Sequence, residues 1–277
     1  MGAVSAMWPG MSDPKDPPSP ARNLTVKSDP VFHALRSLMD RSGTLLGSLG
    51  IFLVGGIVVA GIGTWIFSEL AETVMAGRTQ AFDESVLRWI GARHTPFLDG
   101  VMLEITSLGT GTVVMMIVGV AALFLTLTRH KYSALLLLVA TAGGLVLDML
   151  LKMRIGRPRP HIFTWVTQAF GSSFPSGHAM SATIVYATVA YLAARLQKRL
   201  WARWFTMLFF ALVIALICLS RLYLGVHYPS DVVAGVIIGL SWAAFCMATL
   251  EAIQRYAQRN HPEVAKIEEP APKVEKR

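Results

Sequence analysis

Residues 132–151 read YSALLLLVATAGGLVLDMLL, a run of 20 residues in which Asp148 is the single charged side chain. A segment of about 20 apolar residues is long enough to cross the hydrocarbon core of a bilayer as an α-helix. Because lipid offers the backbone no hydrogen-bonding partners, such a segment has to satisfy its own N–H and C=O groups by forming a helix. The stretch therefore predicts a membrane-spanning helix and an integral membrane protein.

Composition supports the same conclusion for the whole chain. Of its 277 residues, 53% are hydrophobic and 15% are charged, and the mean hydropathy is +0.52. Soluble domains carry about 25% charged residues. The apolar runs follow one another too closely to leave room for a soluble domain, so we expect one all-α, polytopic membrane domain. Its six expected spans are residues 44–68, 105–128, 132–151, 179–196, 204–220 and 231–250.

Three parts are expected along the chain. Residues 1–43 form an N-terminal tail and juxtamembrane segment, and the tail is expected to be disordered because prolines among small and charged residues cannot bury a core. Residues 44–250 form the six-span domain, and residues 251–277 form a charged cytoplasmic tail. Glu104 and the polar run 106–112 (TSLGTGT) open the second span, which is therefore expected to begin at the membrane interface.

Residues 70–97 separate the first two spans and contain the stretch TQAFDESVLRWIGARH. Its pattern predicts a short helix that lies at the membrane interface. Such a helix either covers the mouth of a site or is an inert surface helix, and the sequence leaves both interpretations open. The apolar side of this helix is expected to hold Phe82, Val86, Leu87, Trp89 and Ile90.

The Lys and Arg residues predict the orientation, because cytoplasmic loops are enriched in them. Two short loops are basic, one with Arg129 and Lys131 and one between Arg195 and Arg203. Both termini are therefore expected in the cytoplasm, as in a bacterial inner membrane. This topology explains most of the formal net charge of +8, and since no basic face with interleaved aromatics occurs, no nucleic-acid partner is expected. The outer face is then expected to hold residues 70–97, 152–178 and 221–230.

Three polar clusters interrupt the apolar pattern on the expected outer face. They are residues 152–160 (KMRIGRPRP), 172–179 (SSFPSGHA) and 220–231 (SRLYLGVHYPSD). Each cluster alone fits a Lys or Arg at a helix end, or a turn built from Pro and Gly. Together they supply cations, two histidines and a carboxylate on one side of the membrane, where charged groups tend to mark function.

These groups suit phosphoryl transfer. An Arg guanidinium grips phosphate oxygens in a bidentate way, and a Lys acts as a point charge. Lys152, Arg159 and Arg221 are therefore expected to neutralise the charge of the transferring phosphoryl group. Ser176 and Gly177 are expected to add hydrogen bonds in a turn that lets backbone N–H groups and a helix N-terminus approach the anion.

The two histidines are expected to divide the chemistry. His227 has Asp231 four residues later, and a carboxylate on one imidazole nitrogen leaves the other nitrogen free to attack phosphorus. This arrangement predicts a covalent phosphohistidine. His178, beside the phosphate-binding turn, is expected to protonate the leaving-group oxygen and then to activate water. No carboxylate cluster with metal-ligand spacing occurs in the sequence, so neither a metal nor another cofactor is expected.

The three clusters resemble the signature of the type 2 phosphatidic acid phosphatase superfamily. That pattern is Lys-x6-Arg-Pro, then Pro-Ser-Gly-His, then Ser-Arg-x5-His-x3-Asp, and every specified position matches. The resemblance implies an all-helical membrane fold and a metal-independent active site at the outer surface that acts on phosphorylated lipids. It also implies a nucleophile (His227) with its partner (Asp231) and an acid and base (His178). The remaining matches are the phosphate-binding Lys152, Arg159, Ser176, Gly177 and Arg221, and the structural Pro160, Pro175 and Ser220.

Residues near the motifs leave further alternatives. Asp148 either orients Lys152, one helical turn later, or is a satisfied carboxylate at the interface. Arg154 and Arg157 are expected in solvated positions rather than on a second phosphate. Glu104 is expected to be a helix-end carboxylate rather than part of the substrate mouth.

Three functions remain compatible with the sequence. The favoured one is hydrolysis of a lipid phosphate or pyrophosphate, such as phosphatidic acid, phosphatidylglycerophosphate or a polyprenyl pyrophosphate. The second is a lipid phosphotransferase that passes the phosphoryl group to a hydroxyl acceptor. The third is a non-catalytic lipid transporter or scaffold, which would need neither motif histidine. The expected partners are a phosphorylated lipid and the bilayer, and the sequence makes no prediction of oligomeric state.

Overall fold

The computed structural model describes the backbone of residues 30–260 and the side chains of residues 52–256. The chain forms two compact units, Met1–Ser42 and Gly43–Arg277. The described part of the first unit, from residue 30 on, is helical. The stretch before residue 30, expected to be disordered, and residues 261–277 of the C-terminal tail lie outside the described residues.

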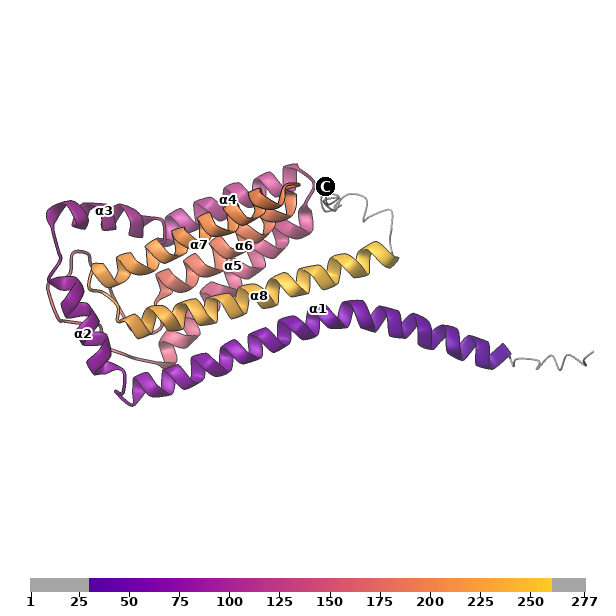
Figure 1. The fold of residues 1–277 in the computed structure, drawn as a ribbon, viewed down its shortest axis with the longest axis horizontal. Coiled ribbons are helices and arrows are strands. Elements are labelled where there is room, and N and C mark those ends of the chain that lie inside the picture. Colours follow the sequence, from indigo (N-terminus) through magenta and orange to yellow (C-terminus); the bar gives the residue numbers. More distant parts are fainter. Residues whose placement is uncertain (1–29, 261–277) are drawn as a thin grey trace, which may run out of the picture. The chain divides into compact units, whose positions relative to one another are not determined.

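Every regular element in residues 30–260 is an α-helix, which confirms the all-α expectation (Figure 1). Three of the helices, α1, α3 and α8, start with a proline, which is favoured there because its missing N–H would have no helical partner. The helices are α1 (Pro30–Met75), α2 (Gln80–Gly91), α3 (Pro96–Ser107), α4 (Gly111–Leu127), α5 (Lys131–Arg154), α6 (Gly177–Leu196), α7 (Leu200–Tyr223) and α8 (Pro229–Asn260).

The helices agree with five of the six expected spans and allow the sixth. Within the described residues, five helical segments are long and apolar enough to cross a membrane, and α3 and α4 pass the same test as a pair, which gives up to six spans. The five continuous spans are Phe52–Met75, Lys131–Arg154, Gly177–Leu196, Leu200–Tyr223 and Pro229–Tyr256.

The pair formed by α3 and α4 is bent by 45° at the break between the two helices. The break falls in the polar run 106–112, where hydroxyl groups compete for backbone carbonyls: Ser107 Oγ donates to Glu104 O at 2.6 Å, and Thr110 Oγ1 donates to Ser107 O at 2.6 Å. The break brings Gly109 close to the ring of His178, because a Cβ at Gly109 would lie 3.1 Å from its Cδ2. The polar run therefore interrupts the span next to a motif residue.

Helix α6 forms the centre of the bundle, packed against α5, α7 and α8 (Figure 1). Its contact with α8 is close because two glycines of α8 face it, four residues apart. A Cβ at Gly235 would lie 2.7 Å from the carbonyl oxygen of Ser176, and one at Gly239 would lie 3.1 Å from that of Met180. Small residues at this spacing let helices approach closely in membranes. The approach sets the start of α8 beside the start of α6.

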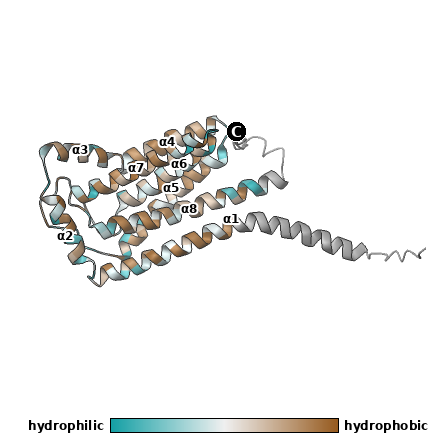
Figure 2. Ribbon diagram, viewed as in Figure 1, coloured by the Kyte–Doolittle hydropathy of each residue, from teal (hydrophilic) through white to brown (hydrophobic). Residues whose placement is uncertain are grey.

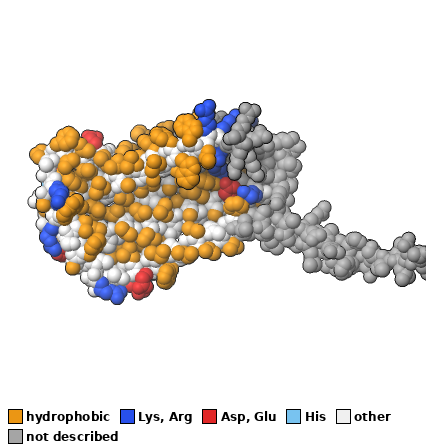
Figure 3. Space-filling view, viewed as in Figure 1, with side chains coloured by type: hydrophobic (Ala, Val, Ile, Leu, Met, Phe, Trp, Pro, Cys, Tyr) orange, Lys and Arg blue, Asp and Glu red, His pale blue; other side chains and the backbone are white. Residues whose placement is uncertain are grey.

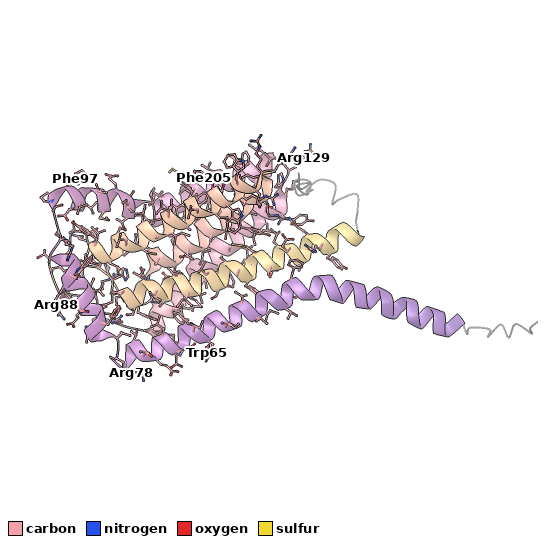
Figure 4. All side chains as sticks on the ribbon, in the orientation of Figure 1. Trp65, Arg78, Arg88, Phe97, Arg129 and Phe205 are labelled. Carbon is pink, nitrogen blue, oxygen red and sulfur yellow. The ribbon has the colours of Figure 1, made fainter. Side chains whose placement is uncertain are left out.

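The sides of the bundle are apolar, and its charges gather toward the ends (Figures 2 and 3). Trp65 and Phe205 lie on the sides and are 67% and 65% exposed, while Arg88 and Arg129 lie toward opposite ends (Figure 4). A soluble protein rarely exposes so large an apolar surface. The chain is therefore an integral membrane protein whose helix sides face lipid.

Helix α2 is the short helix expected within residues 70–97, but its apolar residues do not share one side. Leu87 and Ile90 are buried, whereas Phe82 and Trp89 are 65% and 59% exposed. The inward face holds a carboxylate instead, because Asp83 lies on the same face as Leu87 and Ile90 and is fully buried. The expected apolar side was therefore wrong for Phe82 and Trp89.

Two helices extend into segments that were expected to be tails. Helix α1 begins at Pro30, and α8 continues to Asn260, beyond the expected end of its span at residue 250. The extension of α8 is held to α6 by Glu251, which accepts a hydrogen bond from Tyr191 at 2.6 Å and pairs with Arg195 at 3.2 Å.

Candidate active site

The three motif clusters meet at one end of the bundle. Antiparallel packing places the C-terminal ends of α5 and α7 beside the N-terminal ends of α6 and α8 (Figure 1). Lys152 lies in the last turn of α5, His178 in the first turn of α6, Arg221 in the last turn of α7 and Asp231 in the first turn of α8. Gly177 begins α6 and Ser220 lies in α7, and the loops between the helices carry the remaining motif residues, namely Arg159, Pro160, Pro175, Ser176 and His227.

His227 lies in the turn between α7 and α8 and is 2% exposed. The turn depends on Gly225, which has a φ of 75° and whose Cβ, if present, would lie 2.5 Å from the ring of Phe163. The Nδ1 atom of His227 lies 2.8 Å from the carbonyl oxygen of Ser173, and Nε2 lies 3.2 Å from Nη1 of Arg159. Because the carbonyl can only accept, Nδ1 carries the proton and Nε2 keeps a lone pair on the Arg159 side.

Asp231 is the second neighbour of the same ring nitrogen. Its Oδ2 atom lies 3.5 Å from Nδ1 of His227, farther than the carbonyl oxygen of Ser173. Sequence reasoning anticipated the carboxylate and missed the carbonyl, since a main-chain acceptor leaves no trace in residue types. Burial is the main cause that lowers the pKa of His227 to about 4, Arg221 and Arg159 lower it further, and Asp231 opposes them. The imidazole is therefore neutral at physiological pH.

Arg159 connects the first motif to the turn that carries His227. Its Nη1 atom donates to the carbonyl oxygen of Val226 at 2.8 Å, and Nη2 donates to that of Phe170 at 2.9 Å. Burial lowers the pKa of the guanidinium, and Asp231 partly offsets this effect. These bonds hold the guanidinium beside Nε2 of His227.

Two buried donors in the motifs have no partner among the described residues. They are the hydroxyl Oγ of Ser176 and Nε of Arg221. The neighbouring Nη1 of Arg221 donates to Oγ1 of Thr106 at 2.8 Å, and the backbone N–H of Ser176 donates to the carbonyl oxygen of Asp231 at 3.0 Å. Buried polar groups without a partner are costly, so a ligand that accepts hydrogen bonds at these atoms would offset that cost.

Lys152 and His178 complete the cluster. Lys152 Nζ pairs with Asp148 Oδ2 at 2.8 Å, which decides the open alternative for Asp148 in favour of a pair. A Cβ at Gly177 would lie 2.5 Å from that Nζ, so glycine allows the ammonium group to approach the start of α6. The side chain of His178 makes no hydrogen bond to the described residues, and it lies close enough to Lys152, Arg159 and Arg221 for their charges to act on it.

The three residues expected to be structural have local contacts. The carbonyl oxygen of Pro160 accepts a hydrogen bond from Nε1 of Trp165 at 2.7 Å. Pro175 follows Phe174 through a cis peptide bond. Ser220 is fully buried and its hydroxyl donates to the carbonyl oxygen of Ile217 at 2.7 Å.

Sequence reasoning placed one arginine wrongly. Arg157 was expected in solvent, but its side chain is 9% exposed and pairs with Asp83 at 2.8 Å and with Asp231 at 2.6 Å. Asp83 itself was overlooked, although a carboxylate in helical register with Leu87 and Ile90 is a detectable signal of a buried pair. By contrast, Arg154 is exposed as expected, and Glu104 is an exposed carboxylate in the last turn of α3.

No group of three or more His, Cys, Asp or Glu residues lies together in a way that could hold a metal ion, among the side chains of residues 52–256. The cluster is instead dominated by cations beside a neutral imidazole. An all-helical membrane protein with a histidine nucleophile candidate and unpaired donors around it has the features of a phosphoryl-transfer enzyme.

Comparison with known proteins supports this class. The family model described as the PAP2 superfamily matches residues 132–255. The chain is 31% identical over 194 residues to phosphatidylglycerophosphatase B of Bacillus subtilis, which covers 70% of this chain and 95% of the relative. It is 27% identical over 192 residues to undecaprenyl-diphosphatase of Sulfolobus acidocaldarius, covering 68% and 87%.

A solved structure agrees with the sequence matches. The crystal structure of a transmembrane PAP2-type phosphatidylglycerolphosphate phosphatase from Bacillus subtilis superposes with a TM-score of 0.63 at 27% identity, covering 68% of this chain and 94% of that one. The chain therefore belongs to the PAP2 superfamily. It is a membrane lipid phosphatase, so the hydrolase expectation is confirmed and the non-catalytic alternative is not needed.

Proposed function

We propose that this phosphatase hydrolyses a lipid phosphate monoester or diphosphate through a phosphohistidine on His227, without a metal ion. The observation that carries the proposal is the environment of His227 Nε2. This nitrogen keeps a lone pair beside Arg159, in the cluster where Ser176 Oγ and Arg221 Nε are buried without partners. Arg159, Ser176 Oγ and Arg221 Nε can all donate hydrogen bonds to phosphate oxygens.

In the first step, the Nε2 lone pair of His227 forms a bond to phosphorus and the bond from phosphorus to the leaving-group oxygen breaks. His178, whose imidazolium form the negative charge of the bound phosphate stabilises, gives its proton to that oxygen, so the lipid leaves as an alcohol or as a lipid monophosphate. Charge on the phosphoryl oxygens is balanced by the phosphate-binding residues, namely Lys152, Arg159, Ser176, Gly177 and Arg221.

In the second step, His178 is neutral and accepts a proton from water. The water oxygen bonds to phosphorus, the bond from phosphorus to Nε2 breaks, and inorganic phosphate leaves. His227 recovers its lone pair and His178 its proton, so the cycle needs no further reactant. Asp231, with the Ser173 carbonyl, holds the ring of His227 in the reactive tautomer.

The substrate class follows from the site and from the relatives. The relatives' names point to phosphatidylglycerophosphate and undecaprenyl diphosphate, and both combine a phosphate with a long apolar chain that the lipid-facing helix sides would accommodate. We assign this activity to the domain of residues 44–250. The segments 1–43 and 251–277 are assigned no catalytic role.

A substrate panel tests the activity. Purified protein in detergent is incubated with phosphatidic acid, phosphatidylglycerophosphate or undecaprenyl diphosphate, with His227→Ala as the matched control. Release of inorganic phosphate from at least one lipid by the wild type alone is expected. Absence of release from every lipid would contradict the proposal, and a labelled phosphoryl group found on an added alcohol instead of on water would establish a phosphotransferase.

We also propose that the motif end faces the outer side of a bacterial inner membrane, with both termini in the cytoplasm. Support comes from the basic loops at the other end of the bundle: Arg129 lies there (Figure 4), and Arg199 lies in the loop between α6 and α7. The test is labelling of intact cells with a membrane-impermeant thiol reagent, after Cys218 and Cys246 are replaced by alanine. Phe170→Cys, at a position 84% exposed, should react, and Leu200→Cys, at a position 60% exposed, should not. The reverse pattern would invert the orientation.

A further inference from the structure

Behind the candidate nucleophile lies a bridge of two buried carboxylates and one guanidinium, which we call the carboxylate bridge. Arg157 Nη2 donates to Asp83 Oδ2 at 2.8 Å, and Arg157 Nη1 donates to Asp231 Oδ1 at 2.6 Å. Both aspartates are 0% exposed. Ser230 lies between them: its Oγ accepts from Arg157 at 2.8 Å and donates to Asp83 at 2.6 Å.

The carboxylate bridge joins three segments that are distant in sequence. Asp83 comes from α2, Arg157 from the loop after α5, and Ser230 and Asp231 from the first turn of α8. Asp83 Oδ1 also accepts the backbone N–H of Ser230 at 3.0 Å, and Asp231 Oδ2 accepts that of Tyr228 at 2.8 Å. Carboxylates satisfy free N–H groups at a helix start and are stabilised by the helix dipole there. Helix α2 therefore caps α8 from outside.

Both Nη atoms of Arg157 are engaged by groups of the protein itself. Besides the two carboxylates and Ser230, its guanidinium contacts Gln80 Oε1 at 3.3 Å and lies over the ring of Tyr228, 4.0 Å from its centre. Arg159, two residues later, faces His227 instead. The two arginines of the sequence GRPRP thus have different positions, one behind Asp231 and one at the reactive nitrogen.

We propose that Arg157 and Asp83 are positioning residues for the reaction, holding Asp231 against His227 and limiting the effect of its charge, so that the imidazole stays neutral with Nε2 free to attack. The inference rests on the proposed function, in which His227 is the nucleophile. It assigns α2 a role in the site that is neither a lid nor an inert surface helix.

The electrostatic argument depends on the groups that face His227. Arg159 approaches from the loop, Arg221 from α7 and His178 from α6, while Asp231 from α8 is the carboxylate closest to its ring. The cations disfavour a second proton on the ring, and Asp231 favours one. Arg157 offsets the charge of Asp231 directly. Without Arg157, the negative charge of two buried carboxylates would favour the imidazolium, which has no lone pair to attack with.

The test compares variants by the pH dependence of kcat/KM on a lipid that the wild type hydrolyses. The ratio of variant to wild type is plotted, because ionisation of the substrate then cancels. Arg157→Gln should lose at least about 10-fold below pH ~6.5, the ordinary pKa of histidine, and recover part of this loss above it. KM should change little, because the Nη atoms of Arg157 bond to the protein itself and, under the proposal, Arg157 acts on substrate only through Asp231 and His227. Arg154→Gln, an exposed arginine three residues away, is the matched control and should match the wild type at every pH.

Two further variants separate charge from structure. Arg157→Lys keeps the positive charge beside Asp231. Asp83→Asn removes one of the two carboxylates that pair with Arg157 and keeps the pair between Arg157 and Asp231. Both variants should therefore lower kcat by a factor that does not change with pH. If Arg157→Gln fails to fold, as judged by its thermal midpoint in detergent, the pH dependence of these two variants tests the positioning role instead. A deficit in Arg157→Lys that disappears at high pH, or a pH-independent deficit in a folded Arg157→Gln, would overturn the inference.

A measurement without turnover distinguishes this inference from the proposed function. Diethyl pyrocarbonate modifies neutral imidazole, so its rate of reaction with His227, read by peptide mass, reports the protonation of the ring. In Arg157→Gln the reaction should need a higher pH than in wild type. A wild type without lipid phosphatase activity would contradict the proposed function, whereas an unchanged modification profile in Arg157→Gln would contradict the positioning role alone.

Discussion

The two sides of the His227 ring differ in how their polar groups are satisfied. On the support side, Nδ1 faces the Ser173 carbonyl and Asp231, and every carboxylate oxygen of the carboxylate bridge is hydrogen-bonded. On the phosphate side, Nε2 faces Arg159, and the same cluster holds Ser176 Oγ and Arg221 Nε, which are buried without partners. Folding has satisfied the first side completely, while the second keeps hydrogen-bonding capacity for a ligand.

The largest expected effect is on the phosphate side. His227→Ala removes the atom proposed to accept the phosphoryl group, so lipid hydrolysis should fall to background. The protein should remain folded, because the substitution removes one side chain from the turn between α7 and α8 and leaves both ion pairs of the carboxylate bridge in place. Phosphate release from the lipid panel measures the effect. Hydrolysis by a folded His227→Ala above the level of a buffer blank would assign the nucleophile to another residue.

His178→Ala should cost less than His227→Ala with a substrate that has a good leaving group. A lost general acid or base typically costs 10²-fold to 10⁴-fold, and we expect a loss of that order on a lipid phosphate. A nitrophenyl phosphate needs no protonation of its leaving group, so its first step should be nearly as fast as in wild type. The burst of nitrophenol in rapid mixing measures that step. Equal losses on both substrates would remove His178 from the role of acid.

The support side predicts a loss of stability in acid. Burial lowers the pKa of His227 from 6.5 to about 4, so the folded state resists a proton that the unfolded chain accepts. The contribution of His227 to the free energy of unfolding is therefore complete above pH ~6.5 and is lost as the pH falls toward 4. It amounts to about 3 kcal/mol for this single group. Thermal midpoints in detergent should fall over this window, and less steeply in His227→Ala. Identical slopes would show that other groups control acid stability.

Two buried serines provide a matched pair across the ring. Ser176→Ala removes a hydroxyl without a partner, so stability should be unchanged while activity falls about 10-fold through one lost hydrogen bond to phosphate. Ser230→Ala removes bonds to Asp83 and Arg157 and should cost about 1–3 kcal/mol of stability. Thermal midpoints and kcat/KM of both variants check the contrast. If Ser176→Ala destabilised the protein more than Ser230→Ala, the division into two sides would be wrong.

The smallest expected effect is that of a chelator. The cations of the phosphate side already provide the charge that Mg²⁺ provides in other phosphoryl-transfer enzymes. Hydrolysis should therefore be the same with and without EDTA. A loss of activity in EDTA that Mg²⁺ restores would contradict the metal-independent mechanism.

The sequence predicts the phosphate side better than the support side. The spans follow from hydropathy, and the phosphate side is built from residue types that the signature specifies, such as Arg159 and His178. The support side depends on tertiary contacts: a main-chain carbonyl at Ser173 leaves no residue signal, and Asp83 is distant from Arg157 in the chain.

The same difference explains why the sequence did not predict the position of Arg157 or the close contact between α6 and α8. The solvated position expected for Arg157 followed from its loop context, and nothing local reveals that two carboxylates surround it. The contact between α6 and α8 depends on Gly235 and Gly239, whose spacing is a readable signal of close helix packing that went unused.

Trapping of the phosphoenzyme tests the central claim most directly. His178→Ala, which retains His227 and lacks the base for water attack, is mixed with a labelled nitrophenyl phosphate and quenched in base. The account predicts a base-stable, acid-labile label that maps to the peptide containing His227 and is absent when His227→Ala is added to the same variant. A label that persists in the double variant, or that maps to another peptide, would contradict it.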